Sequence, residues 1–298
     1  MSDAVKSTQQ SGRPLVALES TIITHGMPWP ENVETARRVE ATVRDEGAEP
    51  ATIAVIEGQI HIGLEDEQLE ALGKTENVMK LSRADFAFAI TQGRTGSTTV
   101  AATMIAANLA DITVFATGGI GGVHRGAEHS FDISADLDEL SRTDVTVVCA
   151  GAKALLDIPK TLEVLETKGV PVIAIGTDIL PAFWSRESGI PAPLRLDSAE
   201  EVAKHALAKR GLRLGGGSLV TNPVPTESEI PRAEMEIHIE TALRDAVSQN
   251  VSGKAVTPFV LGRILELTDG RSLDTNIALI LNNARLAAQI AVAEHRLQ

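Results

Sequence analysis

The sequence lacks paired cysteines, a run of basic residues and a long apolar segment. Its single cysteine, Cys149, cannot form an intrachain disulfide and lies inside an apolar run, which predicts a buried thiol in a reducing cytoplasm. The formal net charge is −13, so we expect no nucleic-acid partner and no anionic membrane partner, because both require a basic face. No apolar stretch reaches the roughly 20 residues that a membrane helix needs.

The remaining composition is typical of a globular protein. Of 298 residues, 43% are hydrophobic and 22% charged, which is enough to build one sizeable domain. Residues 1–14 are polar and have neither a signal-peptide core nor an arginine-rich amphipathic pattern, so they are predicted to form a flexible N-terminal tail. No linker or repeat divides residues 15–298, which predicts a single domain.

Short apolar runs alternate with helical patterns along the chain. This alternation predicts a three-layer α/β/α fold with a mixed, mostly parallel central sheet. The expected strands are Leu15–Leu18, Ala51–Ile56, Ile112–Ala116, Val145–Ala150, Val172–Ile175 and Ser218–Val220. The expected helices are Glu31–Glu46, Glu65–Leu72, Thr98–Leu109, Pro159–Lys168, Ser198–Lys209 and Arg232–Val247, followed by a helical portion from about Pro258. Alternation on both sides of a glycine turn predicts a hairpin over Thr52–Gly63, hence a mixed sheet.

Lys153 closely follows the most apolar predicted strand, Val145–Ala150. An amine at the mouth of a buried strand loses hydration, which favours its neutral, nucleophilic form and suits it to form a Schiff base. Glu19 directly follows another predicted strand, where it is either a general acid or a cap for the next turn. His25 and His124 lie beside glycines and could bind an anion or transfer protons, although a lone histidine is more often structural.

Two further segments could bind ligands. Asp132, Ser134 and Asp136 alternate, so an extended chain would place two carboxylates on one side, a site for Mg²⁺ or Mn²⁺ with several waters, unless Asp136 simply caps a helix. Gly93–Val100 precedes a helical stretch whose amides could hold a phosphate, with Lys80 as a possible added charge. Asn276 and Asn283 share a face of the last helix and either line a pocket or bond across helices.

Five blocks, read together, closely resemble the pseudouridine-5′-phosphate glycosidase family, which includes the indigoidine-synthase A-like proteins. The resemblance extends in order from about Leu15 to the C-terminal helices, and it is carried by Ala17–Pro28, Gly96–Met104, Phe115–Gly126, Phe131–Leu137 and Val148–Lys153. It implies reversible cleavage of the C–C glycosidic bond of pseudouridine 5′-phosphate to uracil and ribose 5-phosphate. It also implies a divalent cofactor, usually Mn²⁺, and a homotrimer.

The same resemblance assigns roles to individual residues. Lys153 would form the covalent adduct with ribose C1′, Glu19 would be the acid and base, and Asp132 would anchor the metal. The substrate contacts that it implies are Lys80, Val100, Thr117, His124, Ser134, Ala135, Asp136 and Asn276.

The sequence is also compatible with three other functions. A class I aldolase also forms a Schiff base with a sugar phosphate but cleaves within the sugar chain. A conventional glycosidase would use Glu19 with Asp132 or Asp136 and would not need Lys153. A nucleotide-binding regulatory module would carry no chemistry of its own.

Overall fold

The computed structural model describes residues 1–251 and 253–298, and the side chain of residue 254 is not described. Ten strands of the described chain form one mixed sheet in the order β4-β5-β2-β1-β6-β7-β10-β8-β9, with β3 paired to β2 off this path. The strands are β1 (Leu15–Leu18), β2 (Glu49–Ile56), β3 (Gln59–Ile62), β4 (Met79–Leu81), β5 (Gly96–Thr98), β6 (Val114–Ala116), β7 (Thr146–Cys149), β8 (Val172–Ile175), β9 (Leu194–Leu196) and β10 (Ser218–Thr221).

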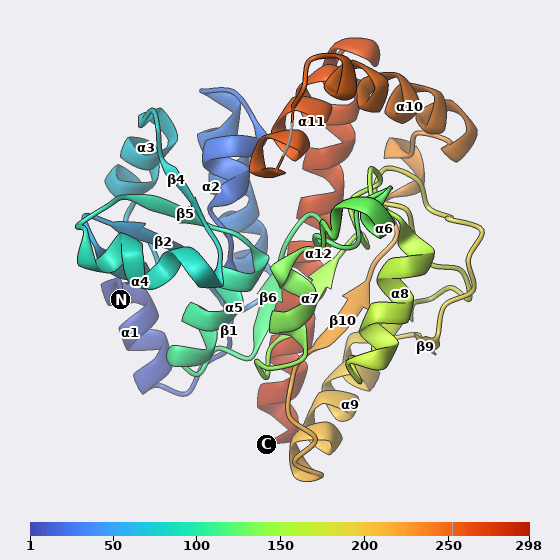
Figure 1. Cartoon of the computed structure of the whole chain (residues 1–298). Coiled ribbons are helices and arrows are strands. Elements are labelled where there is room, and N and C mark those ends of the chain that lie inside the picture. The colour runs from blue at the N-terminus through green and yellow to red at the C-terminus, as the bar shows by residue number, and fades with distance from the viewer. Residues whose placement is uncertain (252) are drawn as a thin grey trace.

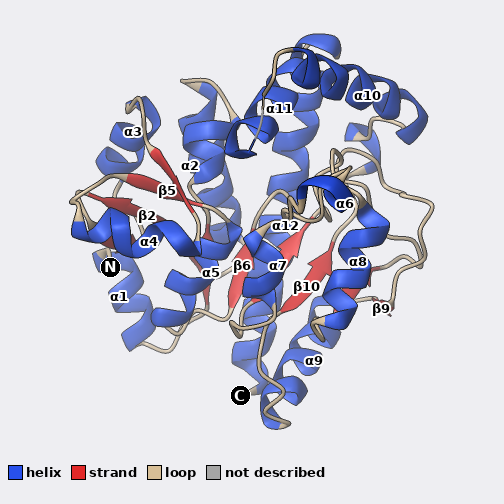
Figure 2. Ribbon diagram, viewed as in Figure 1, coloured by secondary structure: helices blue, strands red, loops and turns tan. Residues whose placement is uncertain are grey.

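Helices cover both faces of this sheet. In Figure 2, α5, α7 and α8 lie in front of the strands and α12 lies behind them, and α12 contacts α2, α9 and the strands β1, β6 and β7. The helices are α1 (Asp3–Gln10), α2 (Glu31–Asp45), α3 (Asp66–Lys74), α4 (Arg83–Thr91), α5 (Val100–Leu109), α6 (Ala127–Ser130), α7 (Ala135–Leu140), α8 (Ile158–Thr167), α9 (Ala199–Gly211), α10 (Arg232–Ser248), α11 (Val256–Leu267) and α12 (Arg271–Leu297), with a π-helical turn η1 (Ile22–Gly26) after β1 (Figure 1). The predicted α/β fold is confirmed.

The central strands are apolar along their whole length because helices bury them on both sides. Val16, Phe115, Val147 and Val148 are all fully buried. The hairpin is also confirmed: β2 pairs with β3 in antiparallel fashion, and Glu57 and Gly58 at its turn both have positive φ, 49° and 77°. β2 and β5 form a second antiparallel pair, while β1, β6, β7, β10, β8 and β9 run parallel.

The structure corrects two boundaries. Residues Asp3–Gln10, expected in a flexible tail, form α1, in which Val5 packs into the core and Gln9 Nε2 donates to the Ala110 carbonyl at 2.8 Å. With Val5 as its main buried apolar residue, this helix is too polar to stand out in the sequence. The helix expected from Thr98 begins at Val100, because Gly96–Thr98 pair with β2 and β4 as strand β5.

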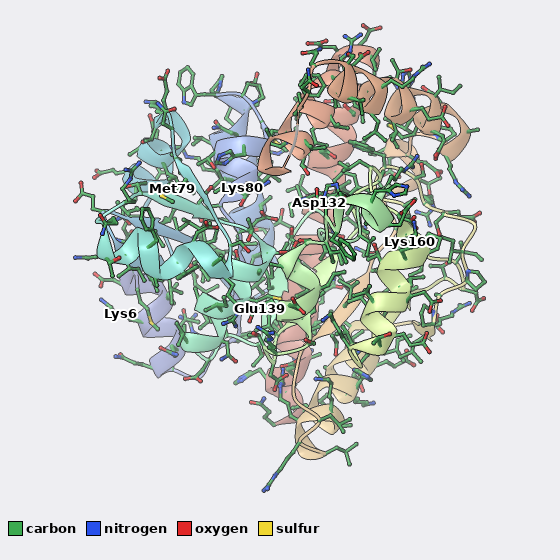
Figure 3. The ribbon with its side chains drawn as sticks, in the orientation of Figure 1. Lys6, Met79, Lys80, Asp132, Glu139 and Lys160 are labelled. Atoms are coloured by element: carbon green, nitrogen blue, oxygen red, sulfur yellow. The ribbon has the colours of Figure 1, made fainter. Side chains whose placement is uncertain are left out.

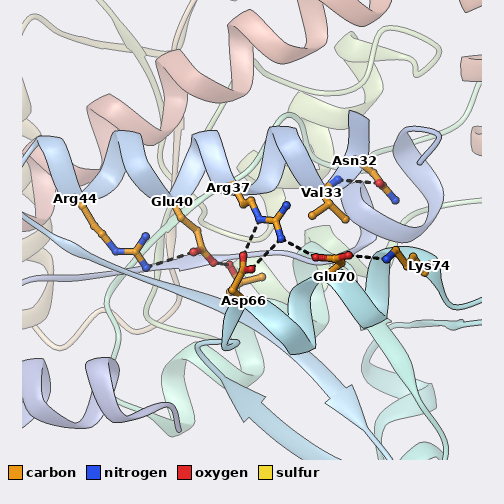
Figure 4. A network of polar contacts seen from close by, with 9 residues as sticks. Asn32, Val33, Arg37, Glu40, Arg44, Asp66, Glu70 and Lys74 are labelled. Carbon is orange, nitrogen blue, oxygen red and sulfur yellow. Dashed lines mark hydrogen bonds and ion pairs between the residues drawn. The ribbon is translucent and has the colours of Figure 1, made fainter. Parts of the chain in front are cut away.

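Charged residues hold α3 against α2 at one end of the sheet (Figure 4). Arg37 donates to Asp66 at 2.6 Å and to Glu70 at 3.0 Å. Exposed ion pairs are screened by solvent and contribute little to stability, so these pairs orient the helices more than they stabilise them. The buried amide of Asn32 is more specific, since it donates to the carbonyls of Ile23 at 2.7 Å and Gly73 at 3.0 Å and so ties η1 to α3. No helix among the described residues is long and apolar enough to cross a bilayer.

Candidate active site

Three neighbouring parallel strands deliver polar side chains to one edge of the sheet. Glu19 directly follows β1, Thr117 directly follows β6, and Lys153 follows β7 by four residues. Because β1, β6 and β7 are adjacent in the sheet, these side chains meet at its carboxyl edge. This edge is where open α/β sheets bind their ligands.

One cavity at this edge brings together residues from the two ends of the chain. It is lined by Glu19, Lys80 and Lys153, by His25 of η1 and by Asn276 of α12. The rest of the lining is largely apolar and comes from η1, the loops after β6 and β8, and the C-terminal helices: Ile22, Met27, Gly118, Gly119, Phe183, Pro258, Leu261 and Leu279. An apolar cavity with a few convergent polar groups is the usual form of a small-molecule site.

Burial raises the pKa of the Glu19 carboxyl above its usual value. The positive charges of Lys153 and Lys80 and a hydrogen bond from the Thr117 hydroxyl to Glu19 Oε1 act in the opposite direction, and the negative charge of Asp136 adds to the rise. Desolvation outweighs the other effects, so Glu19 retains its proton to higher pH than an exposed glutamate. That is the state that a general acid needs.

The segment carrying Lys153 depends on close backbone packing. Its backbone N–H donates to the Ile120 carbonyl at 3.0 Å, and the side chain is half-buried. Gly151 has a φ of 96°, and a Cβ there would lie 2.8 Å from the Pro181 carbonyl oxygen. Only glycine fits such a position without strain.

Phe183 is a cavity residue that the sequence did not indicate. It adopts a φ of 63°, which a bulky side chain rarely does, and it is buried with its ring edge-on to Trp184 at 4.9 Å. A Cβ on Gly119 would lie 2.7 Å from the Phe183 ring, so this glycine gives the ring its place in the wall. A single phenylalanine in a loop has no local sequence pattern that predicts a place in a cavity wall. Leu261 of α11 and Leu279 of α12 also line the cavity without such a pattern.

Lys80 of β4 and His25 of η1 are the other basic side chains that line the cavity besides Lys153. Lys80 lies in the middle of β4, opposite Ser97 of β5, and Figure 3 labels it together with Asp132, which comes from the loop between α6 and α7. His25 Nδ1 lies 2.5 Å from Thr24 Oγ1 and 3.3 Å from Ser97 Oγ. Burial, and then the charge of Lys80, lower the pKa of His25 and favour its neutral form.

The Asp132–Asp136 segment is extended only as far as Ser134, with Ile133 bridged to Val123, and then turns into a helix, which corrects the arrangement expected for two carboxylates on one side. Ser134 caps α7, which begins at Ala135, and Asp136 turns into the interior. Its Oδ1 accepts the Ala101 N–H at 2.9 Å, and its Oδ2 accepts the Gly121 N–H at 2.8 Å. Asp136 thus accepts a backbone N–H at the start of α5, where the sequence predicted that the amides could bind a phosphate. The Ala102 amide there bonds the Thr99 hydroxyl instead.

Asp132 remains near the surface as a candidate metal ligand. Its side chain is 44% exposed, and its Oδ2 lies 3.9 Å from Nδ1 of His124. No group of three or more His, Cys, Asp or Glu side chains that could hold an ion occurs in the described chain. One exposed carboxylate fits a hard cation that keeps most of its waters, and it does not fit a fully protein-ligated ion.

The remaining sequence candidates lie around the same edge. Val100 is the first residue of α5 and is buried, whereas Ala135, the first residue of α7, is exposed. The Oδ1 of Asn276 is buried in the cavity wall and has no hydrogen-bond partner among the described residues, so it is available to a ligand. Lys80, Glu19, Lys153 and Asn276 therefore share one cavity, with Thr117 bonded to Glu19.

Fold and cavity together are those of an α/β protein that acts on small molecules at the carboxyl edge of its sheet. The chain belongs to the family of indigoidine synthase A like proteins, whose model matches residues 4–293. It is 69% identical to pseudouridine-5′-phosphate glycosidase of Paracoccus denitrificans over 94% of this chain and 93% of that protein, and 63% identical to the enzyme of the same name from Solibacter usitatus over 96% of each.

Solved structures share the whole fold. The crystal structure of the prealnumycin C-glycosynthase in complex with ribulose 5-phosphate has a TM-score of 0.92 and 37% identity, covering 100% of this chain and 97% of that one. An indigoidine synthase A-like protein from Thermotoga maritima has a TM-score of 0.89 and 37% identity, covering 96% and 94%. The family resemblance expected from the sequence is confirmed.

Proposed function

We propose that this protein reversibly cleaves the C–C glycosidic bond of pseudouridine 5′-phosphate to uracil and ribose 5-phosphate through a Schiff base on Lys153. The observation that carries the proposal is the cavity shared by Lys153 and Glu19, a half-buried carboxyl whose pKa is raised by desolvation. The names of the close relatives and the sugar phosphate bound to the C-glycosynthase support the choice of substrate.

The chemistry explains why a lysine is required. The atom that leaves C1′ is carbon 5 of uracil, which is a poor leaving group because it has no lone pair to protonate. In the proposed reaction the ribose ring opens, the Lys153 amine bonds to C1′, and the C1′–C5 bond then breaks as the nitrogen lone pair forms the imine. Uracil carbon 5 gains a proton, and water releases ribose 5-phosphate from the lysine.

Glu19 is the group placed to move protons in these steps. In its protonated form it gives a proton to the ring oxygen as the sugar opens, and the carboxylate that results then accepts one from the lysine nitrogen. Glu19 gives this proton to uracil carbon 5 as the C1′–C5 bond breaks. The Thr117 hydroxyl fixes Oε1, which leaves Oε2 to face the substrate. Lys80 and Asn276 line the same cavity and would bind the sugar phosphate and orient the base.

Asp132, with His124 beside it, would hold a Mn²⁺ or another divalent ion through waters. When bound, such an ion stabilises negative charge that develops on the uracil carbonyls. Val100, Ser134, Ala135 and Asp136, at the starts of α5 and α7, do not line this cavity, and their role as substrate contacts rests on the family resemblance. A homotrimer and a cytoplasmic location complete the proposal, the latter because the lone cysteine is a buried free thiol.

The test measures uracil release and sugar adducts on the same preparation. Purified protein with Mn²⁺ and pseudouridine 5′-phosphate should release uracil, and borohydride should trap a ribose 5-phosphate adduct on Lys153, detected by peptide mass. Lys153→Ala should lose both signals, while Lys160→Ala, which removes an exposed lysine of α8, should keep both. Triose products would indicate an aldolase instead, and full activity of Lys153→Ala would indicate a carboxylate mechanism.

A further inference from the structure

A buried asparagine of α12 holds the backbone that carries Thr117. Asn283 is fully buried, and its Nδ2 donates to the Thr117 carbonyl at 2.9 Å and is 3.5 Å from the Gly118 carbonyl. Its Oδ1 accepts from Nδ2 of Asn222 at 3.2 Å. Asn222 directly follows β10, and its own backbone N–H donates to the Cys149 carbonyl at 2.8 Å.

The chemistry of the partners sets the direction of this chain of hydrogen bonds. Backbone carbonyls only accept, so Asn283 must turn its NH₂ group toward Thr117 and Gly118. Its oxygen then faces Asn222, which supplies the matching NH₂ group. The amide groups of both asparagines therefore have one orientation that satisfies all of these hydrogen bonds. The bonds join the ends of β6, β7 and β10 to α12.

The segment held by Asn283 contacts Glu19 and the start of the loop that carries Lys153. The Thr117 hydroxyl donates to Glu19, and the Gly118 carbonyl accepts the Ala150 N–H at 2.9 Å at the start of the loop that leads to Lys153. A shift of this segment would therefore move the acid and the nucleophile relative to each other. Misplacement by about 1 Å can lower a rate by two orders of magnitude.

We propose that Asn283 is a positioning residue, which fixes the Thr117–Gly118 segment and through it the geometry of Glu19 and Lys153. This role rests on the function proposed above. Asn283 does not line the cavity, so its effect on the reaction passes through Thr117. The neighbouring Asn282 is a matched control, because its side chain donates to a different carbonyl, that of Pro223, at 3.1 Å. Its backbone carbonyl accepts from Asn222 Nδ2 at 3.3 Å, a bond that Asn282→Ala keeps.

The first test compares Asn283→Ala with Asn282→Ala in the full-length protein with Mn²⁺. Asn283→Ala should lower kcat for uracil release at least about tenfold with a smaller change in KM, because orientation is lost while the cavity wall stays. Asn282→Ala should stay within about twofold of the wild type, the range of a substitution outside the network. Equal kinetics of the two variants would overturn the role.

The second readout is the pH profile, which a purely structural role would not move. The charged groups facing Glu19 are Lys153 after β7, Lys80 of β4 and Asp136 of α7, and Asn283→Ala removes none of these charges. The Thr117 hydrogen bond lowers the pKa of Glu19, so loosening it should shift the Glu19 limb of the kcat profile to higher pH. His25 also titrates in this cavity, so the limb is assigned to Glu19 by its loss in Glu19→Gln. An unshifted limb would contradict the proposal.

A double-mutant cycle tests whether Asn283 acts through Thr117. Thr117→Val and Asn283→Ala should be non-additive, with the double variant within about twofold of the slower single variant. Additive losses would overturn the proposal. If Asn283→Ala does not fold, as judged by circular dichroism, Asn222→Ala replaces it, since it removes the partner that orients Asn283, together with a bond to the Asn282 carbonyl, and keeps the Asn283 side chain. It should lower kcat in the same direction, and wild-type kinetics of this variant would overturn the role. If the wild type releases no uracil, the proposed function itself fails, a result distinct from equal behaviour of the two asparagine variants.

Discussion

Asp136 is the residue for which the structure makes the sharpest stability prediction. Both of its carboxylate oxygens accept backbone N–H groups, one from Ala101 and one from Gly121, and the residue is 6% exposed. In Asp136→Asn only one side-chain oxygen remains, so an NH₂ group faces one of the two N–H donors. The buried donor then has no acceptor.

The expected cost follows from these contacts. Loss of one hydrogen bond to a charged group removes about 1.5–3 kcal/mol. Loss of the negative charge at the start of α5 removes about 0.3–1 kcal/mol more. We therefore expect Asp136→Asn to lower the free energy of unfolding by about 2–4 kcal/mol.

Urea denaturation followed by circular dichroism measures this difference, with Asp138→Asn as the control. Asp138 belongs to the same helix, but its side chain is 49% exposed and pairs with Lys168 at 2.5 Å, so its substitution should cost less than about 1 kcal/mol. A change below about 0.5 kcal/mol for Asp136→Asn, the size of an ordinary surface substitution, would show that the two hydrogen bonds from Ala101 and Gly121 do not stabilise the fold as argued. It would leave Asp136 as a substrate contact alone.

Three further predictions concern single residues. The pKa of Glu19 is raised above 4.5 in the folded state, so this group lowers the stability of the folded state as pH rises from about 4.5 toward the folded pKa. Glu19→Gln should remove that loss, so the Tm of the variant minus that of the wild type should increase with pH. A Tm difference that does not change with pH would contradict the raised pKa. Gly151→Ala should destabilise the protein by about 1–3 kcal/mol, measured by urea denaturation, because alanine would be strained at a φ of 96° and would meet the Pro181 carbonyl; unchanged stability would show that the loop relaxes freely. Burial raises the pKa of the Cys149 thiol to about 12, so a thiol reagent should react with the urea-unfolded protein and not with the native protein at pH 8; rapid native reaction would place the thiol at the surface.

The sequence by itself determined the fold class and the positions of the main elements. Apolar runs such as Leu15–Leu18 and Val172–Ile175 coincide with β1 and β8, because strands covered on both faces must be apolar throughout. The sequence also identified Glu19 and Lys153 as residues just beyond strand ends. Where the local signal was weak it failed, as at α1, an eight-residue polar helix in which Val5 is the buried apolar residue.

Only the tertiary structure decided which side chains meet. Glu19, Lys80, Lys153 and Asn276 are separated by long stretches of chain, and they converge because β1, β6 and β7 are neighbours in the sheet and α12 crosses behind them. The direction in which Asp136 points depends on α5 and on Gly121, which no local pattern around Asp136 encodes. The same holds for Phe183 and Asn283, whose contacts come from the backbone of the loops after β6 and β7. Periodicity indicates which face of a helix or strand is buried, whereas the partners of a side chain depend on which strands and helices are neighbours in the folded protein.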